Sequence, residues 1–315
     1  MKKMTVACFV MSTALWAQPA LPKYKVVKGY PGAANIAAIN AAADQGYRVA
    51  FAYQSTVLRL ESIPPDTYRY LPLPQARAGA SFLNTLNQQG ALGYRWVDTL
   101  LEKEPHPRNY EYRTAEGFTL NSRDASAEEL VREGFEQIGE SLGGVVYIRE
   151  LGNSDIKTRR PSRVLYERTG KNFMKKIGPL AREGYRYRSK EPIRGGRRGL
   201  MMELCDSSCG GAVEYRSFDV KEAAQLEHDL NSLGAEGFRV LPNSLYNEPY
   251  LAERTAAARQ SYSYRVISVS DDQAVEDALN AGDREGYDAL GVAAHVGWTA
   301  HVFVILKKTI ASTAP

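Results

Sequence analysis

The sequence predicts an α+β fold made of six tandem β-α-β-β units, the third of them degenerate, with helices packed on antiparallel-rich sheets. A glycine followed by an aromatic residue recurs six times, and the glycines lie 41 to 53 residues apart. Each pair follows a helical pattern and precedes strand-like segments. A period of this size is typical of one small structural unit repeated along the chain. The pairs are Gly46-Tyr47, Gly93-Tyr94, Gly134-Phe135, Gly184-Tyr185, Gly237-Phe238 and Gly286-Tyr287.

A first strand is expected before each helix, at residues 24–27, 68–70, 163–166, 213–215 and 264–267. In the third copy this strand is expected to shrink to about residues 118–120. The helices follow, and their apolar residues recur seven and eleven positions before the glycine, as Leu230 and Leu226 do before Gly237. These steps form one stripe on a helix, so each helix has one face to bury. Six positions before the glycine, beside the stripe, four copies carry asparagine: Asn40, Asn87, Asn231 and Asn280.

The recurring glycine is interpreted as the residue that closes the helix, because it adopts positive φ without a Cβ penalty. Gly46, Gly93, Gly134, Gly184, Gly237 and Gly286 are thus structural caps. A glutamate precedes four of them, near the negative end of the helix dipole, so we expect solvent or a strand arginine to offset its charge. These residues are Glu133, Glu183, Glu236 and Glu285.

After the glycine the apolar pattern becomes strand-like, and two strands complete each unit. Third strands are predicted at residues 57–60, 110–113, 145–148, 200–203, 250–253 and 302–305. The aperiodic segment 153–161 is interpreted as a linker between two halves of three units, 21–152 and 162–308. Residues 309–315 are a C-terminal tail.

Residues 1–20 resemble a secretory signal, with Lys2 and Lys3 before an apolar core. The core is too short to span a bilayer. The mature protein is therefore expected to be periplasmic or secreted, and not an integral membrane protein. Lipidation of Cys8 is the alternative. Removing the signal takes the net charge from +4 to +2, which argues against a nucleic-acid partner.

Only Cys205 and Cys209 remain after cleavage of the signal, and an exported protein usually joins two cysteines this close. A disulfide is therefore predicted. A redox pair or half of a metal site is the alternative, although the spacing is not C-x-x-C and no histidine or third cysteine lies near in sequence.

The unit resembles a family of short, uncharacterised bacterial domains. Their pattern is an opening Tyr-Lys-Val strand, then Leu-Asn-x-x-Gly-x-x-Gly-aromatic, then a closing strand. Residues 230–238 match best, with 24–27 and 302–307 as flanking strands. The resemblance covers most of the mature chain, is weaker in the third and fourth units, and departs from the family in having Tyr or Phe where Trp is usual. It implies a fold and no activity.

Two surface patterns in the sequence are candidate binding sites. Tyr-Arg occurs eight times, and strand alternation with Tyr inward and Arg outward explains it better than nucleic-acid binding does. Basic residues gather in the linker and in a predicted hairpin, where they offer a surface for an anionic envelope polymer or protein. They are Lys157, Arg159, Arg160, Arg194, Arg197 and Arg198.

No catalytic constellation or cofactor motif stands out. His295 and His301 flank a predicted hairpin turn, but the four histidines lack a metal-ligand spacing. The sequence therefore favours a non-catalytic binding or scaffold protein of the cell envelope, with no cofactor. The alternative is a hydrolase of envelope polymers, with acidic residues gathered at a junction between units.

Overall fold

The computed structural model describes residues 21–61, 66–74, 79–115, 126, 129–141, 144–152, 162–167, 169–194, 197–205, 212–245, 248–255, 260–269, 271–295 and 301–310. The chain forms six small three-stranded antiparallel sheets with helices between them, an α+β fold of repeated units. The predicted fold class is confirmed.

Units 1 to 3 form the first half of the chain. Unit 1 is β1 (Tyr24–Val27), α1 (Ile36–Ala43), β2 (Tyr47–Ala52) and β3 (Thr56–Leu60). Unit 2 is β4 (Arg69–Pro72), α2 (Gly79–Ala91), β5 (Tyr94–Val97) and β6 (Leu100–Lys103). Unit 3 is β7 (Tyr110–Thr114), a helix described at 129–132, β8 (Glu136–Ser141) and β9 (Gly144–Glu150).

Units 4 to 6 form the second half. Unit 4 is β10 (Ser162–Glu167), α4 (Gly170–Arg182), β11 (Tyr185–Arg194) and β12 (Arg197–Leu204). Unit 5 is β13 (Val213–Phe218), α5 (Ala223–Ala235), β14 (Arg239–Val240), the 3₁₀ helix η2 (Pro242–Ser244) and β15 (Tyr250–Thr255). Unit 6 is β16 (Ser261–Ser268), α6 (Asp272–Arg284), β17 (Asp288–His295) and β18 (His301–Ile310).

The third strand is central in every sheet, and the first and second strands flank it antiparallel. One predicted strand belongs to a different unit. Tyr110–Thr114 pairs with β9 as the first strand of unit 3, whereas β6 is the third strand of unit 2. The prediction of a shrunken first strand in unit 3 is therefore wrong, and residues 118–120 lie outside the described part. The error arose because the Pro105–Pro107 segment resembles a hairpin turn but connects two units.

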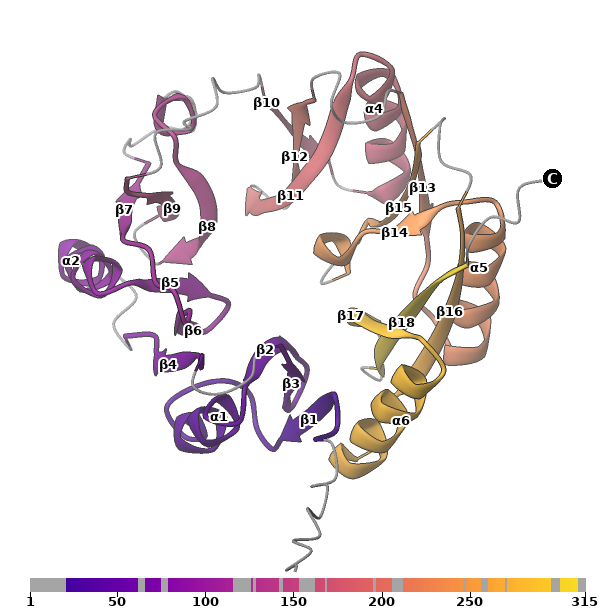
Figure 1. Cartoon of the computed structure of the whole chain (residues 1–315). Helices are drawn as coiled ribbons and strands as arrows, with labels where there is room; N and C mark the ends of the chain where they lie inside the picture. The colour runs from indigo at the N-terminus through magenta and orange to yellow at the C-terminus, as the bar shows by residue number, and fades with distance from the viewer. Residues whose placement is uncertain are drawn as a thin grey trace, which may run out of the picture.

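The six units form a ring in which the helices lie outside and the second strands face the centre (Figure 1). The apolar faces of α1, α2, α4, α5 and α6 pack on their own sheets and on the first strand of the following unit, with β1 following α6. One core cluster, for example, joins Leu226 and Leu230 of α5 to Tyr262 and Tyr264 of β16. Because each helix helps to cover the next sheet, every unit depends on its neighbour.

An asparagine bridge joins neighbouring units. The side-chain amide of Asn231 on α5 accepts from the backbone N–H of Tyr264 and donates to its C=O, both at 2.9 Å. Asn40, Asn87 and Asn280 bond in the same way to Tyr70, Tyr112 and Tyr24. At these four joints, the helix of one unit thereby bonds to the free edge of the next unit's first strand.

A tyrosine bridge adds a second contact at five of the six joints. The hydroxyl of the first-strand tyrosine accepts from the backbone N–H three residues after the glycine of the preceding unit. The pairs are Tyr70 with Val49, Tyr112 with Trp96, Tyr215 with Tyr187, Tyr264 with Val240 and Tyr24 with Ala289, at 2.7–2.9 Å. At the joint of units 3 and 4, strand register places Ser162 at the tyrosine position.

The first strand of the chain closes the ring against the last unit. The backbone of Tyr24 forms the asparagine bridge with Asn280, and its hydroxyl accepts from the N–H of Ala289. The N–H of Val26 also donates to Glu276, at 2.7 Å. Lys23 forms ion pairs with Asp283 at 2.8 Å and Asp288 at 2.6 Å. The joint between the chain's two ends is therefore built like the internal joints, without a covalent connection.

The six recurring glycines have φ between 85° and 103°, the left-handed conformation expected of helix-closing residues. After Gly237, the N–H of Phe238 donates to the C=O of Leu233, and the Phe238 ring lies between the guanidinium groups of Arg216 and Arg254. Arg216 also pairs with Glu236 at 2.8 Å. Arg113 and Arg265 pair likewise with Glu133 and Glu285, so strand arginines offset three of the four glutamates as predicted.

Candidate functional site

The copies differ most in the loops that lead from the first strand into the helix. This loop has eight residues in unit 1 (28–35), and in unit 2 it is described at Leu73 and Pro74. In unit 5 the same loop has four residues (219–222). Since a binding site on a repeated scaffold is expected where the copies diverge, the longer loop of unit 1 indicates a site at the joint of units 1 and 2.

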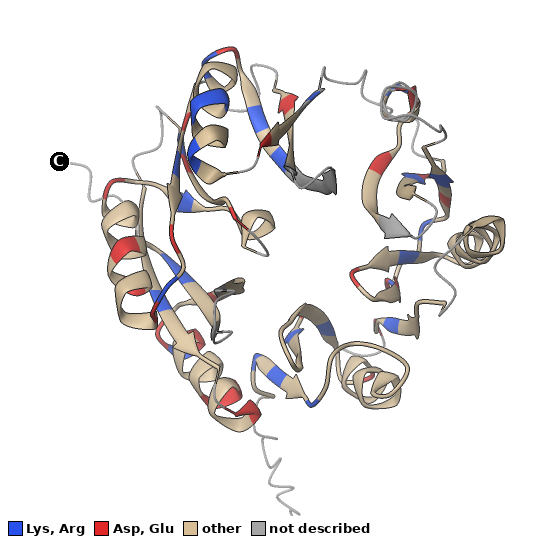
Figure 2. Cartoon of the chain, turned by 180° about the vertical axis from the view of Figure 1, so that it is seen from behind, with Lys and Arg blue, Asp and Glu red and all other residues tan. Residues whose placement is uncertain are grey.

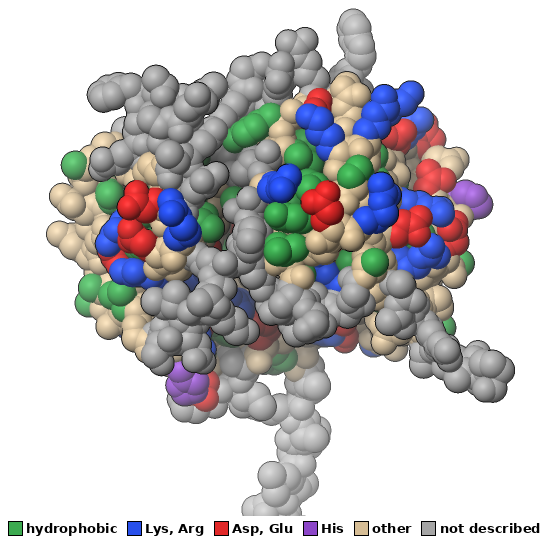
Figure 3. Space-filling model, turned by 90° about the horizontal axis from the view of Figure 1, so that it is seen from above, with side chains coloured by type: hydrophobic (Ala, Val, Ile, Leu, Met, Phe, Trp, Pro, Cys, Tyr) green, Lys and Arg blue, Asp and Glu red, His purple; other side chains and the backbone are tan. Residues whose placement is uncertain are grey.

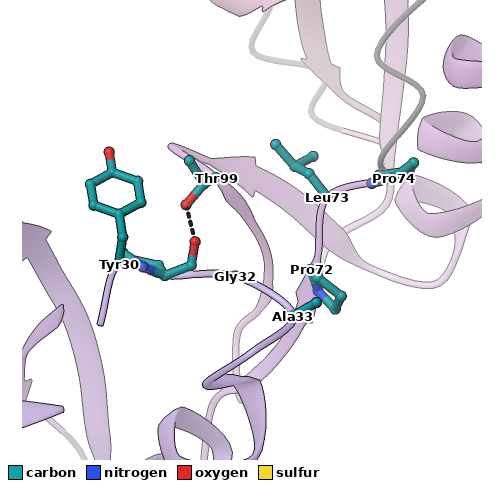
Figure 4. A pocket seen from close by; sticks show the side chains of 8 residues that line it. Tyr30, Gly32, Ala33, Pro72, Leu73, Pro74 and Thr99 are labelled. Carbon is teal, nitrogen blue, oxygen red and sulfur yellow. Dashed lines mark hydrogen bonds between the residues drawn. The ribbon is translucent and has the colours of Figure 1, made fainter. Parts of the chain in front are cut away.

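A pocket of about 480 Å³ opens at this joint (Figure 4). The loops of units 1 and 2 both contribute to its wall, together with the turn between β5 and β6. Thr99 of this turn donates its hydroxyl to the C=O of Pro31 at 2.7 Å, and thereby ties unit 2 to the unit 1 loop. The lining residues are Tyr30, Pro31, Gly32, Ala33, Pro72, Leu73, Pro74 and Thr99.

Tyr30 is the residue best placed to meet a ligand. It lies at the pocket, and 42% of its surface is exposed, which is unusual for a large side chain in this protein. Its hydroxyl donates to Asp98 at 3.1 Å. Asp98 sits in the turn before Thr99 with φ of +53°, a conformation that aspartate tolerates better than most residues. The tyrosine ring is thus held at its hydroxyl end beside the pocket.

The chemistry of the lining favours an uncharged, partly apolar group. None of the eight lining residues carries a formal charge, and proline, leucine and tyrosine side chains supply its apolar surface. The Thr99 hydroxyl is already bonded to protein. Flat or ring-shaped apolar groups pack well on tyrosine and proline faces, with polarity at the rim to orient them.

A cluster of carboxylates lies at the same joint. Arg48 of β2 contacts Glu102 at 2.7 Å, Glu104 at 3.3 Å and Glu61 at 3.4 Å. Glu102 is 1% exposed and accepts from the Tyr70 hydroxyl at 2.8 Å. Burial alone would raise the pKa of Glu61, but hydrogen bonds and charge from Arg59 and Arg48 outweigh it and hold that pKa below its usual value.

In this cluster, the ion pairs of Arg48 with Glu102 and Glu104 join unit 1 to unit 2. A general acid needs a carboxyl whose pKa lies near the working pH. The pKa of Glu61 is instead lowered, and the positive charge of Arg48 compensates the neighbouring carboxylates. Burial, followed by the Glu102 charge, raises the pKa of Tyr70, so its hydroxyl stays protonated and donates to Glu102. Glu61 therefore does not provide the acid of raised pKa that the hydrolase alternative requires, and that alternative stays a prediction.

The predicted basic residues belong to two segments that adjoin opposite ends of the unit 4 sheet. Arg194 and Arg197 pair at the hairpin end of β11 and β12, next to the Glu167 end of β10. The segment that contains Lys157, Arg159 and Arg160 enters at the Ser162 end, roughly 17 Å away along the strand. The three linker residues lie outside the described part, as do the side chains of Arg194, Arg197 and Arg198. A shared anion-binding surface stays a prediction.

The other predicted candidates have structural or untested positions. Tyr47, Tyr68, Tyr112, Tyr185, Tyr187, Tyr215 and Tyr264 of the Tyr-Arg repeats are buried, so this pattern belongs to the core. His295 and His301 are cross-strand neighbours by register. Cys205 follows β12, but Cys209 lies outside the described residues, so their disulfide stays a prediction. Among the residues that the structure describes, no three His, Cys, Asp or Glu are grouped to hold a metal ion.

No family model matches the chain, and neither does any curated protein or any solved structure. The resemblance to short bacterial domains therefore remains a prediction from the repeated motif. In the described part of the chain, each helix is too short or too polar to cross a bilayer.

Proposed function

We propose that this protein is an exported, non-catalytic binding or scaffold protein of the cell envelope, periplasmic or secreted, which uses the joint of units 1 and 2 as its ligand site. The observation that carries the proposal is the pocket of about 480 Å³ between the first-strand-to-helix loops of units 1 and 2. Its partner would be another envelope protein or an envelope polymer. The leader-like residues 1–20 support export, and the predicted Cys205–Cys209 bond suits an oxidising compartment.

The arrangement of the site favours binding. The units around it are fixed to one another by the Asn40 bridge, the Tyr70 bridge and the Arg48 cluster, so the pocket walls are positioned before a ligand arrives. Because the walls of a preorganised site are already ordered, little binding free energy is lost in ordering them. The loops that differ between units shape the pocket, and the repeated joints maintain the ring. Repeat proteins commonly acquire specificity through such variation on a constant scaffold.

Photocrosslinking in cells tests this proposal. A photoreactive amino acid at Tyr30 places the reactive group at the pocket, and the same group at Leu92 reports an exposed apolar position on the helix end of unit 2. The proposal predicts a discrete crosslinked species, recovered from the envelope fraction, from position 30 and not from position 92. Equal products at both positions, or none at position 30, would contradict a ligand site in this pocket. Cell fractionation with N-terminal sequencing tests export separately.

A further inference from the structure

The outer face of α4 carries an unusual line of positive charge. Lys171, Lys175 and Arg182 are all exposed, and steps of four and seven residues place them on one stripe within roughly 40° around the helix. The stripe lies opposite Phe173 and Ile177, which are buried against the core. Blue segments mark α4 in Figure 2, whereas red segments are prominent on α5 and α6.

Among the residues that the structure describes, these three cations have no partners. In the described part of the chain, none of them forms an ion pair or a hydrogen bond. Their neighbour Lys176 pairs with Glu167, and the strand arginines at the joints, such as Arg216, pair with glutamates. Figure 3 views the molecule from the α4 side, where several Lys and Arg side chains reach the surface. Glu183, one residue after Arg182, is the acid next in sequence to the stripe.

Two of the three charges in the stripe are electrostatically unfavourable for the helix that carries them. Lys171 lies in the first turn, where the helix dipole disfavours a cation, and the first turn of α4 has no acidic residue. Lys171 and Lys175 are four residues apart, a spacing at which like charges repel. Arg182, in the last turn, is the one member of the stripe that the dipole favours. Charges that weaken their own helix without a compensating contact are typical of a site that meets a ligand.

We infer that the α4 stripe, defined as Lys171, Lys175 and Arg182, binds a linear polyanion that runs along the outer edge of unit 4. The stripe is roughly 17 Å long at 1.5 Å per helical residue, so a chain with negative groups every few ångströms meets all three cations at once. Extended polyanions gain affinity from such lines of charge through the release of counterions. This binding surface lies in the other half of the chain from the pocket at Tyr30, and it goes beyond the proposed function.

Binding of short-chain inorganic polyphosphate to the mature protein tests the inference. Three cationic contacts give a slope of log affinity against log salt of roughly −2, so affinity falls roughly 20-fold between 50 and 200 mM salt. The triple variant K171Q/K175Q/R182Q is expected to lose binding at 50 mM salt and most of the salt dependence. The matched variant K28Q/K221Q/R284Q removes the same charge from exposed positions elsewhere and is expected to keep both.

Two further measurements make the test decisive. Thermal unfolding of the triple variant should show an unchanged or higher midpoint, because like-charge repulsion is removed and no contact is lost. Equal loss of affinity in both triple variants would overturn the inference, since net charge alone would then explain binding. Binding to vesicles containing phosphatidylglycerol without binding to polyphosphate would also overturn it, because the partner would then be a membrane surface.

Discussion

Replacing Asn280 by alanine should release the first strand from the last helix. The amide of Asn280 makes two 2.9 Å hydrogen bonds to the backbone of Tyr24. Each net hydrogen bond is worth about 1 kcal/mol, and leaving partly buried backbone groups unpaired adds to the loss. We therefore expect a loss of about 2–4 kcal/mol at this joint.

Amide hydrogen exchange measures the effect directly. A loss of about 2–4 kcal/mol corresponds to exchange that is roughly 30- to 700-fold faster in β1 under conditions where exchange reports opening. Asn231→Ala removes the same pair of bonds at an internal joint, where the chain continues from unit 5 into unit 6, and should leave β1 protected. Asn172→Ala, at an exposed position on α4, is the control for loss of an asparagine alone.

The reasoning would be refuted if Asn280→Ala and Asn172→Ala gave the same exchange in β1. It would also fail if Asn231→Ala exposed β1 as much as Asn280→Ala does, because the effect would then be global and would not belong to the closing joint.

Three other predictions concern the repeated unit. Gly234→Ala should destabilise by about 3 kcal/mol in urea unfolding, because its Cβ would lie 2.1 Å from the carbonyl oxygen of Tyr262. A Cβ at Gly178 would meet only the flexible Arg182 side chain, at 3.9 Å, so Gly178→Ala should stabilise by up to about 1 kcal/mol. Equal effects of the two substitutions would contradict the close helix–strand contact. Gly237→Val should cost at least about 2 kcal/mol because φ is +86°, and an unchanged thermal midpoint would refute the helix-cap assignment. The pKa of Glu61 is lower in the folded protein than in the unfolded chain, where it is about 4.3. Its stabilising contribution is therefore present above the unfolded pKa and is lost as pH falls through the folded pKa. Glu61→Gln should make stability in urea fall less steeply below about pH 5, and a pH profile as steep as that of the wild type would contradict this.

The units were predictable because their signals are local. A glycine such as Gly237 follows a helical stripe within a dozen residues, and a strand begins directly after it. The expectation that strand arginines offset the glutamates also needed local information alone, since the helix dipole disfavours Glu236 wherever the helix packs. The cross-strand pairing of His295 and His301 followed from a single hairpin.

The ring was not predictable from these signals. An apolar stripe shows that a helix buries one face, but it does not say which other sheet that face meets. Asn231 was visible beside the stripe, yet its bond to Tyr264 crosses into the next unit. The pocket was missed for the same reason, because its walls come from two units. Its one sequence signal was the extra length of the loop at 28–35, which no repeated residue marks.

The central claim is that β1 closes a ring of six units by packing against α6, and zero-length crosslinking tests it most directly. Lys23 lies 2.8 Å from Asp283, so carbodiimide should join their side chains without a spacer. The ring predicts a crosslinked peptide that links residue 23 to residue 283 in the monomeric fraction, and its loss in Lys23→Gln. The absence of this peptide from the monomer, or its recovery in dimers alone, would contradict closure within one chain.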